Sequence, residues 1–268
     1  MQVLESDTAL VTGASSGIGR AFADRLARQG AEVVLVARRK AVLEELAGEL
    51  RTRHGARVHV ITADLARPGA AARLKDELQE RGLSVDIVVN NAGIGVHGDI
   101  ADTDLATVTT QIQLNVTALA ELTALLLPGM VARRHGAIVN IASTAAFQPV
   151  PHMAVYAATK AFVLSFTQAL WAETRKTGVR VVAVCPGATD TEFFETAGED
   201  AAVGRRRTPD HVVDTAMRAL SRKGPSVVDG RLNALVAALA PRLPRRTAIG
   251  IAERSVRPAS AQTVGTSA

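Results

Sequence analysis

The segment Thr8-Ala-Leu-Val-Thr12-Gly13-Ala-Ser-Ser-Gly17-Ile-Gly19 indicates the type of fold. Residues Thr8 to Thr12 are apolar or β-branched, which predicts a buried strand. The glycines then predict a tight turn, and an apolar periodic pattern predicts a helix from Gly17 to Gln29. A strand that passes through such a turn into a helix presents the helix N-terminus, with its free N–H groups, to a phosphate.

Apolar β-rich runs and helical patterns alternate beyond this segment. The sequence predicts strands over 32–37, 57–62, 85–89, 137–141 and 179–184, and a short seventh strand over 226–228. It predicts a helix through Leu43, Leu46 and Leu50, helices over Asp102–Arg133 and Ala154–Thr177, and one that begins at Pro209. Strands joined by helices pair in parallel through right-handed crossovers. We therefore expect an α/β fold with one doubly wound, mostly parallel seven-stranded sheet, helices on both faces, and ligands at the carboxyl ends of the strands.

Composition narrows the class of protein. Of the 268 residues, 47% are apolar and only 3% aromatic, so Ala, Val, Leu and Ile must build the core. No apolar run approaches the length of a spanning helix, and residues 1–7 lack the features of a secretory signal. The single cysteine, Cys185, excludes an internal disulfide and fits a reducing compartment. These features predict a cytoplasmic protein.

The C-terminal quarter differs from the rest of the chain. From Val203 onward, 12 Lys and Arg residues stand against four acidic ones. We expect one domain over residues 1–230, an apolar and basic helical extension over 231–257, and a disordered tail over 258–268. Three partners fit the extension: the domain itself or a sister subunit, an anionic membrane surface, or an acidic partner such as an acyl carrier protein or a coenzyme A thioester.

The glycine-rich turn has two interpretations. In the first, Gly13 permits the turn, Gly17 lets the backbone approach a pyrophosphate, and Gly19 allows close packing of helix and strand. In the second, Gly13-x-Ser15-x-Gly17 is the nucleophile elbow of an α/β-hydrolase, with Ser15 as the nucleophile. The elbow normally follows a strand and loop that supply the oxyanion hole, and only one strand precedes it here. The dinucleotide interpretation is therefore favoured.

The residues after the second strand bear on which dinucleotide binds. A site selective for NAD offers a carboxylate there to the ribose hydroxyls, whereas this chain has Arg38 and Arg39. A guanidinium suits a 2′-phosphate, so the pair favours NADPH, although two arginines after a strand also occur as plain solvated surface. No cluster of His, Cys and acidic residues has metal-ligand spacing, and we expect no metal.

A second group of polar residues follows the later strands. Tyr156-Ala-Ala-Thr-Lys160 places a phenol and an ammonium on one helix face, and Ser143 follows the fifth strand. Asn115 lies within the long helix that precedes that strand. Its sequence Asn115-Val-Thr117 matches a glycosylation sequon, which has no meaning in a protein that is not secreted.

Taken together, these motifs resemble the short-chain dehydrogenase/reductase family, in its NADP-preferring branch. The resemblance covers roughly residues 7 to 230 and implies a Rossmann-like catalytic domain. It rests on motifs that occur in family order: the glycine-rich segment, Asp64, Asn90-Asn91-Ala92-Gly93, Asn115, Ser143, Tyr156-x-x-x-Lys160 and Pro186-Gly187…Thr191. The resemblance implies an oxidoreductase that interconverts a ketone and its secondary alcohol by hydride transfer with NADPH.

The resemblance also implies individual roles. Tyr156 is the acid–base group, Lys160 acidifies it and holds the nicotinamide ribose, Ser143 orients the substrate oxygen, and Asn115 holds a water that relays protons. Lowering the phenol pKa from about 10 to about 7 takes roughly 4 kcal/mol, which Lys160 and the oxidised nicotinamide can supply. The implied cofactor contacts are Gly13, Ser15, Ser16, Gly17, Ile18, Gly19, Arg38, Arg39, Asp64, Leu65, Asn91, Ala92, Gly93, Tyr156, Lys160, Pro186, Gly187, Thr189 and Thr191.

The substrate pocket in this family is lined by the segments after Ser143 and after Pro186-Gly187. The residues of these segments that we expect in the pocket are Phe147, Val150, His152, Met153, Phe193 and Phe194. They are largely apolar, which predicts a small lipophilic carbonyl substrate. A loop from about Thr191 to Arg207 is expected to close over the cofactor. By resemblance, the two long helices form the interface of a homodimer or homotetramer.

Two other functions are weighed against the enzyme. An NADPH sensor without turnover would have no need of Tyr156, Lys160, Ser143 and Asn115. Nucleic-acid binding is disfavoured because one Trp and one Tyr form no stacking platform. Cys185 is interpreted as buried packing.

Overall fold

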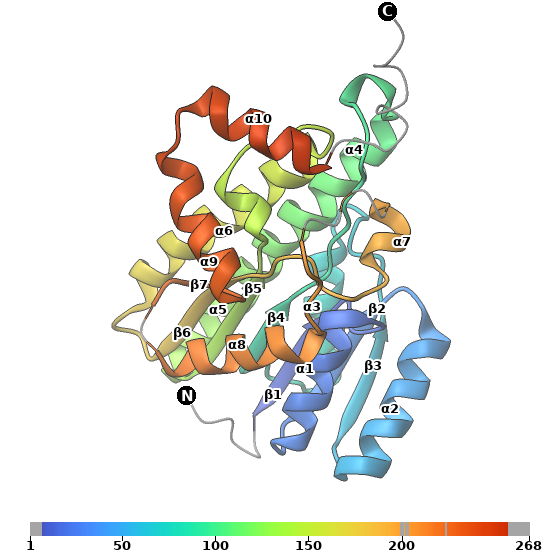
Figure 1. The fold of residues 1–268 in the computed structure, drawn as a ribbon. Coiled ribbons are helices and arrows are strands. Elements are labelled where there is room, and N and C mark those ends of the chain that lie inside the picture. The colour runs from blue at the N-terminus through green and yellow to red at the C-terminus, as the bar shows by residue number, and fades with distance from the viewer. Residues whose placement is uncertain (1–6, 199–200, 202–203, 223, 257–268) are drawn as a thin grey trace, which may run out of the picture.

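The fold is built on one fully parallel sheet of seven strands in the order β3-β2-β1-β4-β5-β6-β7 (Figure 1). The computed structural model describes residues 7–198, 201, 204–222 and 224–256. The strands are β1 Thr8–Thr12, β2 Glu32–Ala37, β3 Val58–Thr62, β4 Ile87–Asn90, β5 Gly136–Ile141, β6 Val179–Cys185 and β7 Ser226–Val228. The predicted doubly wound α/β class is confirmed, and the sheet is parallel throughout rather than mostly.

Helices cover both faces of the sheet. One face packs against α1 Gly17–Arg28, α2 Lys40–His54 and α8 Pro209–Ser221, and the other against α3 Ala70–Glu80, α5 Ala118–Arg133 and α6 Ala154–Thr174. Phe22 and Leu26 of α1 are fully buried on the first face, as Leu122 and Met130 of α5 are on the second. The core is aliphatic, as the composition requires, because parallel strands are buried on both faces.

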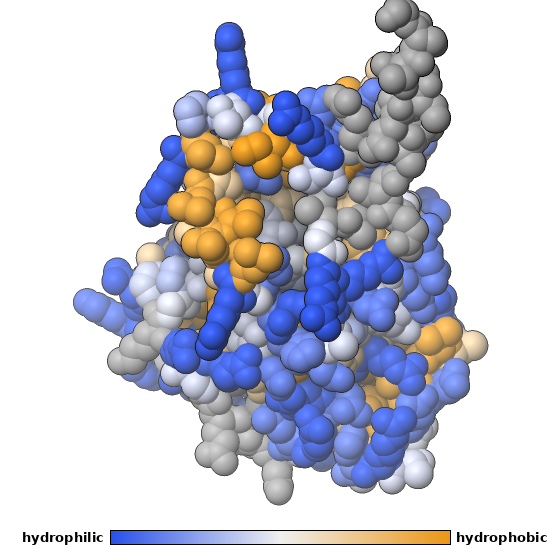
Figure 2. Space-filling model, viewed as in Figure 1, coloured by the Kyte–Doolittle hydropathy of each residue, from blue (hydrophilic) through white to orange (hydrophobic). Residues whose placement is uncertain are grey.

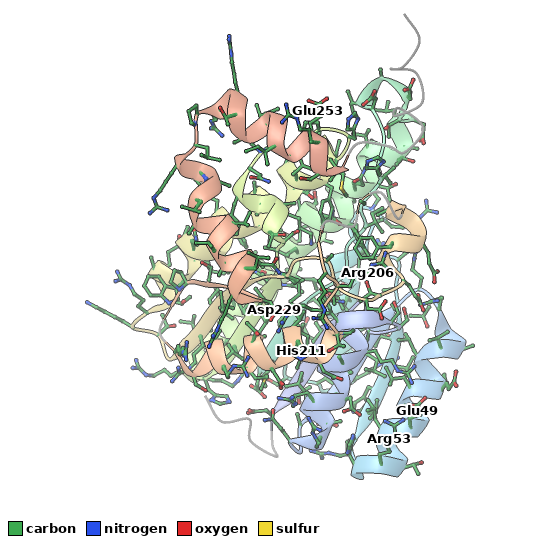
Figure 3. The ribbon with its side chains drawn as sticks, viewed as in Figure 1. Glu49, Arg53, Arg206, His211, Asp229 and Glu253 are labelled. Atoms are coloured by element: carbon green, nitrogen blue, oxygen red, sulfur yellow. The ribbon has the colours of Figure 1, made fainter. Side chains whose placement is uncertain are left out.

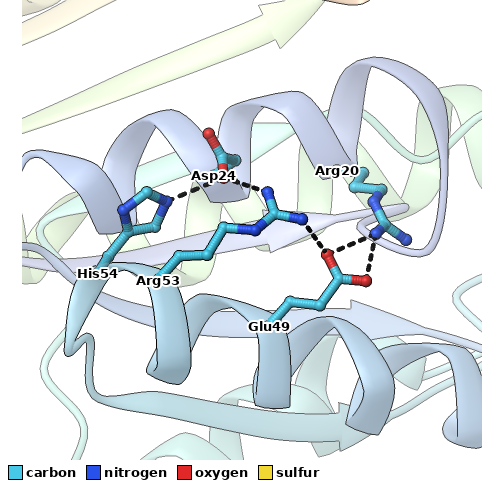
Figure 4. A network of polar contacts seen from close by, with 5 residues as sticks. All are labelled: Arg20, Asp24, Glu49, Arg53 and His54. Atoms are coloured by element: carbon cyan, nitrogen blue, oxygen red, sulfur yellow. Dashed lines mark hydrogen bonds and ion pairs between the residues drawn. The ribbon is translucent and has the colours of Figure 1, made fainter.

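A chain of ion pairs joins α1 to α2 near the first strands (Figure 4). Glu49 of α2 lies 2.7 Å from Arg20 and 3.0 Å from Arg53, and Asp24 lies 3.7 Å from Arg53 and 2.9 Å from His54. Exposed pairs of this kind add little stability singly, but the network fixes the two helices relative to each other. It thereby supports the turn that leads into α1.

The structure differs from the sequence expectations in three places. Helix α3 was not predicted, although its buried residues Ala70, Ala71, Leu74 and Leu78 recur at helical spacing. The predicted helix Asp102–Arg133 consists of a short helix η1 Ile100–Asp102, α4 Leu105–Ile112, a π-helical segment η2 Gln113–Thr117 and α5. A short helix α7 Phe193–Ala197 lies within the predicted closing loop.

The run Leu105–Arg133 is long and apolar enough, by length and composition, to cross a membrane. In this fold it is a core helix, since Leu122, Leu126 and Met130 pack against the sheet.

The basic C-terminal segment forms α9 Arg231–Leu239, a short turn η5 Ala240–Arg242, and α10 Arg245–Val256. A further short helix, η3 Thr144–Phe147, follows β5. The predicted tail 258–268 lies outside the described residues.

Candidate active site

The main cleft lies at the carboxyl ends of the strands, beside the point where the strand order reverses between β1 and β4. Its volume is about 440 Å³. Such a crevice is the expected ligand position in an open parallel sheet. The cleft is lined by 18 of the 19 residues implied as cofactor contacts, all but Gly19, together with Ser143, Ile94, Leu114, Glu192, Phe193 and Glu195, among others.

The glycine-rich turn shapes a cradle at one side of this cleft. Gly13 and Gly17 have φ angles of 64° and 52°, which only glycine adopts readily. A Cβ at Gly17 would lie 2.7 Å from Cγ2 of Thr191, and one at Gly19 would lie 2.2 Å from the carbonyl oxygen of Gly13. Gly19 is therefore a packing position, which explains its absence from the cleft wall. The bare backbone at Gly13 and Gly17 suits the close approach of a pyrophosphate.

Two polar side chains implied as cofactor contacts also hold local backbone. The amide nitrogen of Asn91 donates to the carbonyl oxygens of Thr12 and Gly13, at 3.0 and 3.2 Å. The carboxylate of Asp64 accepts from the backbone N–H of Ala66 at 3.1 Å. Both residues therefore shape the loops that line the cleft, whatever else they contact.

Arg39 stands at the opposite end of the cleft from Tyr156 along the strand edge. Its guanidinium donates to the hydroxyl of Ser15 at 3.1 Å and to the carboxylate of Glu192 at 2.7 Å. Arg39 is thus held over the glycine-rich turn by a residue of the segment after β6. Sequence reasoning did not identify Glu192, because no local pattern links positions 153 residues apart.

Tyr156, Lys160 and Ser143 meet at the other end. Tyr156 and Lys160 lie on the first turns of α6, and the Lys160 ammonium is 5.7 Å from the centre of the Tyr156 ring. The ammonium donates to the carbonyl oxygen of Ile141 at 2.8 Å, at the end of β5. The Ser143 hydroxyl, two residues later, hydrogen-bonds with the Tyr156 phenol and favours its ionised form. A phenol, an ammonium and a hydroxyl therefore converge on one point.

Burial sets the ionisation of this group. It raises the pKa of Tyr156 to about 12, an effect that the hydrogen bond from Ser143 only partly offsets. It also lowers the pKa of Lys160 to about 8, because the buried ammonium is desolvated. Burial likewise raises the pKa of Cys185 to about 12, so this thiol stays protonated. The shift of Tyr156 is opposite to the acidification that the sequence predicts for the cofactor complex, because desolvation opposes any charge that no partner compensates.

Asn115 lies in the π-helical segment, 1% exposed, and joins three elements. Its amide nitrogen donates to the carbonyl oxygen of Ile94 at 2.8 Å and to the hydroxyl of Thr159 at 3.0 Å, and its oxygen accepts from the N–H of Ile94 at 2.9 Å. Both Asn115 Oδ1 and Lys160 Nζ face Gly93, at 3.0 and 3.4 Å from the position of a Cβ there. A π-bulge inside a helix is common at functional sites.

Comparison with known proteins supplies the family. The profile of the short chain dehydrogenase family matches residues 7–202. The chain belongs to the short-chain dehydrogenase family. Sulfoacetaldehyde reductase 2 of Chromohalobacter salexigens is 42% identical to this dehydrogenase over 218 residues, which are 79% of this chain and 86% of that protein. The match confirms the family predicted from the motifs, and with it an oxidoreductase acting on carbonyl or CH–OH groups.

Solved structures of the family agree with this architecture. A short-chain dehydrogenase from Sphingobium yanoikuyae in complex with NADPH superposes with a TM-score of 0.79 at 39% identity, covering 87% of this chain and 93% of that one. The bulky-bulky ketone specific alcohol dehydrogenase from Comamonas testosteroni has a TM-score of 0.76 at 35% identity and covers 88% and 92%. The Rossmann-like fold is therefore shown by both the topology and the comparison.

Of the six expected substrate-pocket residues of this short-chain dehydrogenase, Phe193 lines the cleft and the other five do not. Val150 and Met153 are buried in one apolar cluster, with Phe193 and the Tyr156 ring packed against it. Phe147 packs instead against the cluster of Leu119, Val163 and Cys185. Phe194 is 7% exposed, and the guanidinium of Arg206 lies 4.3 Å from its ring (Figure 3 labels Arg206). His152 contacts Asp99 through Nδ1 at 2.6 Å and has a φ of 61°.

The loop after β6 is anchored at its far end by a buried acid. Asp229, which follows β7 and is fully buried, accepts from Arg207 at 2.5 Å and from Thr215 of α8 at 2.6 Å (Figure 3). A charge buried in this way is held by ion pairing and hydrogen bonding together. Sequence reasoning did not single out Asp229, although an isolated acid after a short apolar strand could have drawn attention to it.

Proposed function

We propose that this chain is an NADPH-dependent carbonyl reductase that interconverts a lipophilic ketone and its secondary alcohol, with Tyr156 as the acid–base group. One observation carries the proposal. A single cleft has the guanidinium of Arg39 and a glycine cradle at one end and the phenol, ammonium and hydroxyl of Tyr156, Lys160 and Ser143 at the other. The two groups are separated along the sheet edge, because Arg39 follows β2 and Ser143 follows β5 in the strand order β2-β1-β4-β5, and an extended dinucleotide is long enough to reach both.

The residues present fit NADP(H). The glycine cradle at Gly13 and Gly17 leaves bare N–H groups for the pyrophosphate, and Arg39 offers a bidentate donor to a 2′-phosphate. The related dehydrogenase from Sphingobium yanoikuyae is described in complex with NADPH. When bound, NADPH supplies the hydride that reduces the carbonyl carbon.

The protein's own residues handle the proton. The Ser143 hydroxyl orients the carbonyl oxygen toward the Tyr156 phenol, which donates its proton as negative charge develops on that oxygen. The ammonium of Lys160, fixed by the carbonyl oxygen of Ile141, stabilises the phenolate that remains. Asn115 and Lys160 share the space beside Gly93, through which we propose that the phenol regains its proton from solvent.

The neighbourhood of the phenol favours an apolar substrate. Tyr156 packs against the apolar cluster that contains Val150 and Met153, and the ring centres of Tyr156 and Phe193 are 5.4 Å apart. Apolar walls of this kind bind hydrocarbon substituents and offer nothing to the hydroxyls of a sugar. The structural relative from Comamonas testosteroni is described as specific for bulky-bulky ketones, which supports the same substrate class.

Loss of NADPH absorbance in the presence of aryl ketones, steroids and 3-oxoacyl thioesters tests the proposal. We expect turnover with at least one lipophilic ketone, and we expect Tyr156→Phe to retain NADPH binding while losing nearly all activity. Retention of a tenth of the wild-type rate would contradict the assignment of Tyr156. Tight NADPH binding without turnover of any ketone would favour the alternative function, a cofactor sensor.

We propose that the protein is a cytoplasmic homo-oligomer. Helices α5 and α6 carry large apolar side chains that stay open on their outer faces, Leu125 and Phe162 being 39% and 41% exposed. Phe162 stacks on Phe166 at 5.7 Å, which presents a flat aromatic surface. Light scattering measures the mass of wild-type protein and of Phe162→Glu. If Phe162 lies at a subunit interface, the introduced charge should lower the mass of the assembly, and an unchanged mass would reject this interface.

A ridge on α9 is a candidate for peripheral membrane contact. Leu232, Leu235, Val236 and Leu239 are 51–73% exposed, and Figure 2 shows the apolar surface over α9 and α10. Residues 231–256 carry five arginines and one acid, so the ridge is flanked by positive charge. We propose that it rests on an anionic membrane surface. In flotation with phosphatidylserine vesicles, the Leu235→Ser variant should no longer float with the vesicles, whereas Leu105→Ser, at an exposed position outside α9, should float as wild type does. Equal recovery of both variants in the vesicle fraction would reject the membrane contact.

A further inference from the structure

The end of α10 lies beside the catalytic phenol. Val256, the last residue of this helix, is 3% exposed. It is buried in the same apolar cluster as Val150, Met153 and Ala157, and the rings of Tyr156 and Phe193 pack against that cluster. A segment about 100 residues downstream of Tyr156 in sequence therefore belongs to the apolar cluster against which the catalytic tyrosine packs.

Periodic burial along α10 explains why Val256 points inward. Ala248, Ala252 and Val256 follow one another at every fourth position and are 4%, 3% and 3% exposed. Residues four apart lie on one helix face, so this face packs against the domain. Ile251, on the other side of α10, is 49% exposed. The two small alanines let α10 approach closely, and Val256 is the bulky side chain at its inner end.

A hydrogen bond fixes the position of Val256. The Nε2 atom of His97 lies 2.6 Å from the Val256 carbonyl oxygen, and because a carbonyl only accepts, His97 donates. The ring centres of His97 and His152 are 5.8 Å apart, and His152 is held by Asp99. The N–H of Gly98 also donates to the carbonyl oxygen of His152 at 2.8 Å. The loop after β4, the segment before α6 and the end of α10 are thereby joined around the pocket.

Helix α10 lies outside the part of the chain that defines the family, because the family profile ends at residue 202. Figure 1 shows α9 and α10 at the end of the molecule that also holds the carboxyl ends of the strands. Val256 thus belongs to a helix, α10, that lies outside the segment containing Ser143, Tyr156 and Lys160. Such an element is suited to setting substrate selectivity, since catalysis and selectivity then depend on different residues.

We propose that Val256 is a specificity-determining residue: it belongs to the apolar cluster that backs Tyr156 and Phe193 in the cleft wall, and the size of its side chain limits how far a ketone substituent can extend there. The inference rests on the proposed carbonyl reductase function. Val256 shares this cluster with Val150 and Met153, so a smaller side chain at position 256 would leave more room for a ketone substituent beside Tyr156 and Phe193. The His97 hydrogen bond holds the backbone of Val256 in place, so the room left for the substituent depends on the side chain at position 256.

Steady-state kinetics with a series of phenyl alkyl ketones of increasing chain length tests this. Val256→Ala should raise kcat/KM for the longest ketone by about tenfold relative to the shortest, since one or two methylene groups in an apolar pocket discriminate by this order. Val256→Phe should shift the preference in the opposite direction. Ile251→Ala, on the outer face of the same helix, should leave the ratio unchanged, and NADPH affinity should stay constant in all three variants.

A second measurement does not depend on turnover. Tyr156 is the only tyrosine of the chain, so nitration by tetranitromethane, located by peptide mass spectrometry, reports on this phenol alone. With NADP⁺ bound, Val256→Gly should be nitrated several times faster than wild type and Ile251→Ala. Equal nitration rates, or a chain-length preference identical in Val256→Ala and Val256→Phe, would overturn the proposal. A wild type that reduces no ketone would overturn the proposed function, and nitration would still decide whether Val256 covers Tyr156.

Discussion

The guanidinium of Arg39 lies 2.7 Å from the carboxylate of Glu192, across the cleft in which the dinucleotide is proposed to bind. The two side chains come from opposite walls, Arg39 from the end of β2 and Glu192 from the segment that precedes α7. Both are about half exposed, so the pair is worth little in stability. Its consequence concerns binding, because a 2′-phosphate and Glu192 compete for the same donor.

Glu192→Gln should therefore tighten NADPH binding by about threefold, the order of an exposed ion pair, while leaving NADH binding unchanged. NADH serves as the internal control because it lacks the phosphate. Fluorescence titration of both dinucleotides measures the effect, and Glu195→Gln, a neighbouring acid of the cleft, is the matched variant. In an Arg39→Ala background the gain should vanish, and its persistence there would rule out competition for Arg39.

Gly17→Ala should impair the cofactor cradle. The residue has a φ of 52°, and a Cβ would lie 2.7 Å from Thr191 Cγ2, so the substitution strains the backbone and displaces Thr191. We expect a loss of about 1 kcal/mol in stability and a fall of about tenfold in NADPH affinity. Gly48→Ala in α2, where nothing lies within 4 Å, should instead raise the melting temperature slightly. Unchanged NADPH affinity in Gly17→Ala would show that the turn does not approach the cofactor.

The sequence alone predicted those elements and site residues that are marked by a local pattern. The strand Thr8–Thr12 and the helix start at Pro209 were predicted as the structure has them, because apolar runs and proline act within a few residues. The motif residues of the cleft were also identified, since they recur at strand ends. Long-range partners such as Glu192 for Arg39 and Val256 for His97 were not, because no periodicity connects residues brought together only by the fold.

The π-helical segment shows the same limit. Residues 113–117 carry no signal that distinguishes them from the α-helix on either side, yet the extra residue in this turn accompanies the contacts of Asn115 with Ile94 and Thr159. The sequence therefore predicted one straight helix. The motif also could not predict that the pKa of Tyr156 is raised, because burial of the phenol depends on how α6 and α10 pack around it.

Asn115→Ala should lower kcat by more than tenfold, because it releases both Ile94 and Thr159 and empties the space beside Gly93. Unsatisfied buried partners should also cost about 1–3 kcal/mol of stability. Asn140→Ala is the matched control, since Asn140 is equally buried but bonds to Asn90 and Thr167. If both variants lost activity in proportion to stability, Asn115 would have only a structural role. A change in the pH–rate profile of Asn115→Ala alone would support proton relay.

Lys160→Met should abolish turnover and yet stabilise the protein at neutral pH. Burial lowers the pKa of Lys160 from 10.5 to about 8, which corresponds to a cost of about 3 kcal/mol for holding the ammonium inside at pH 7. Removing the hydrogen bond to Ile141 destabilises the variant by about 1 kcal/mol, so the free energy of unfolding of Lys160→Met should exceed that of wild type by about 2 kcal/mol. Between pH 8 and 10.5 the unfolded chain holds a proton that the folded protein releases, so wild-type stability rises with pH over this window. The advantage of Lys160→Met in thermal unfolding should therefore shrink from pH 7 to pH 10. Lys176→Met, at an exposed position, should show no such dependence, and a constant difference between wild type and Lys160→Met would mean that the ammonium is not destabilised by burial.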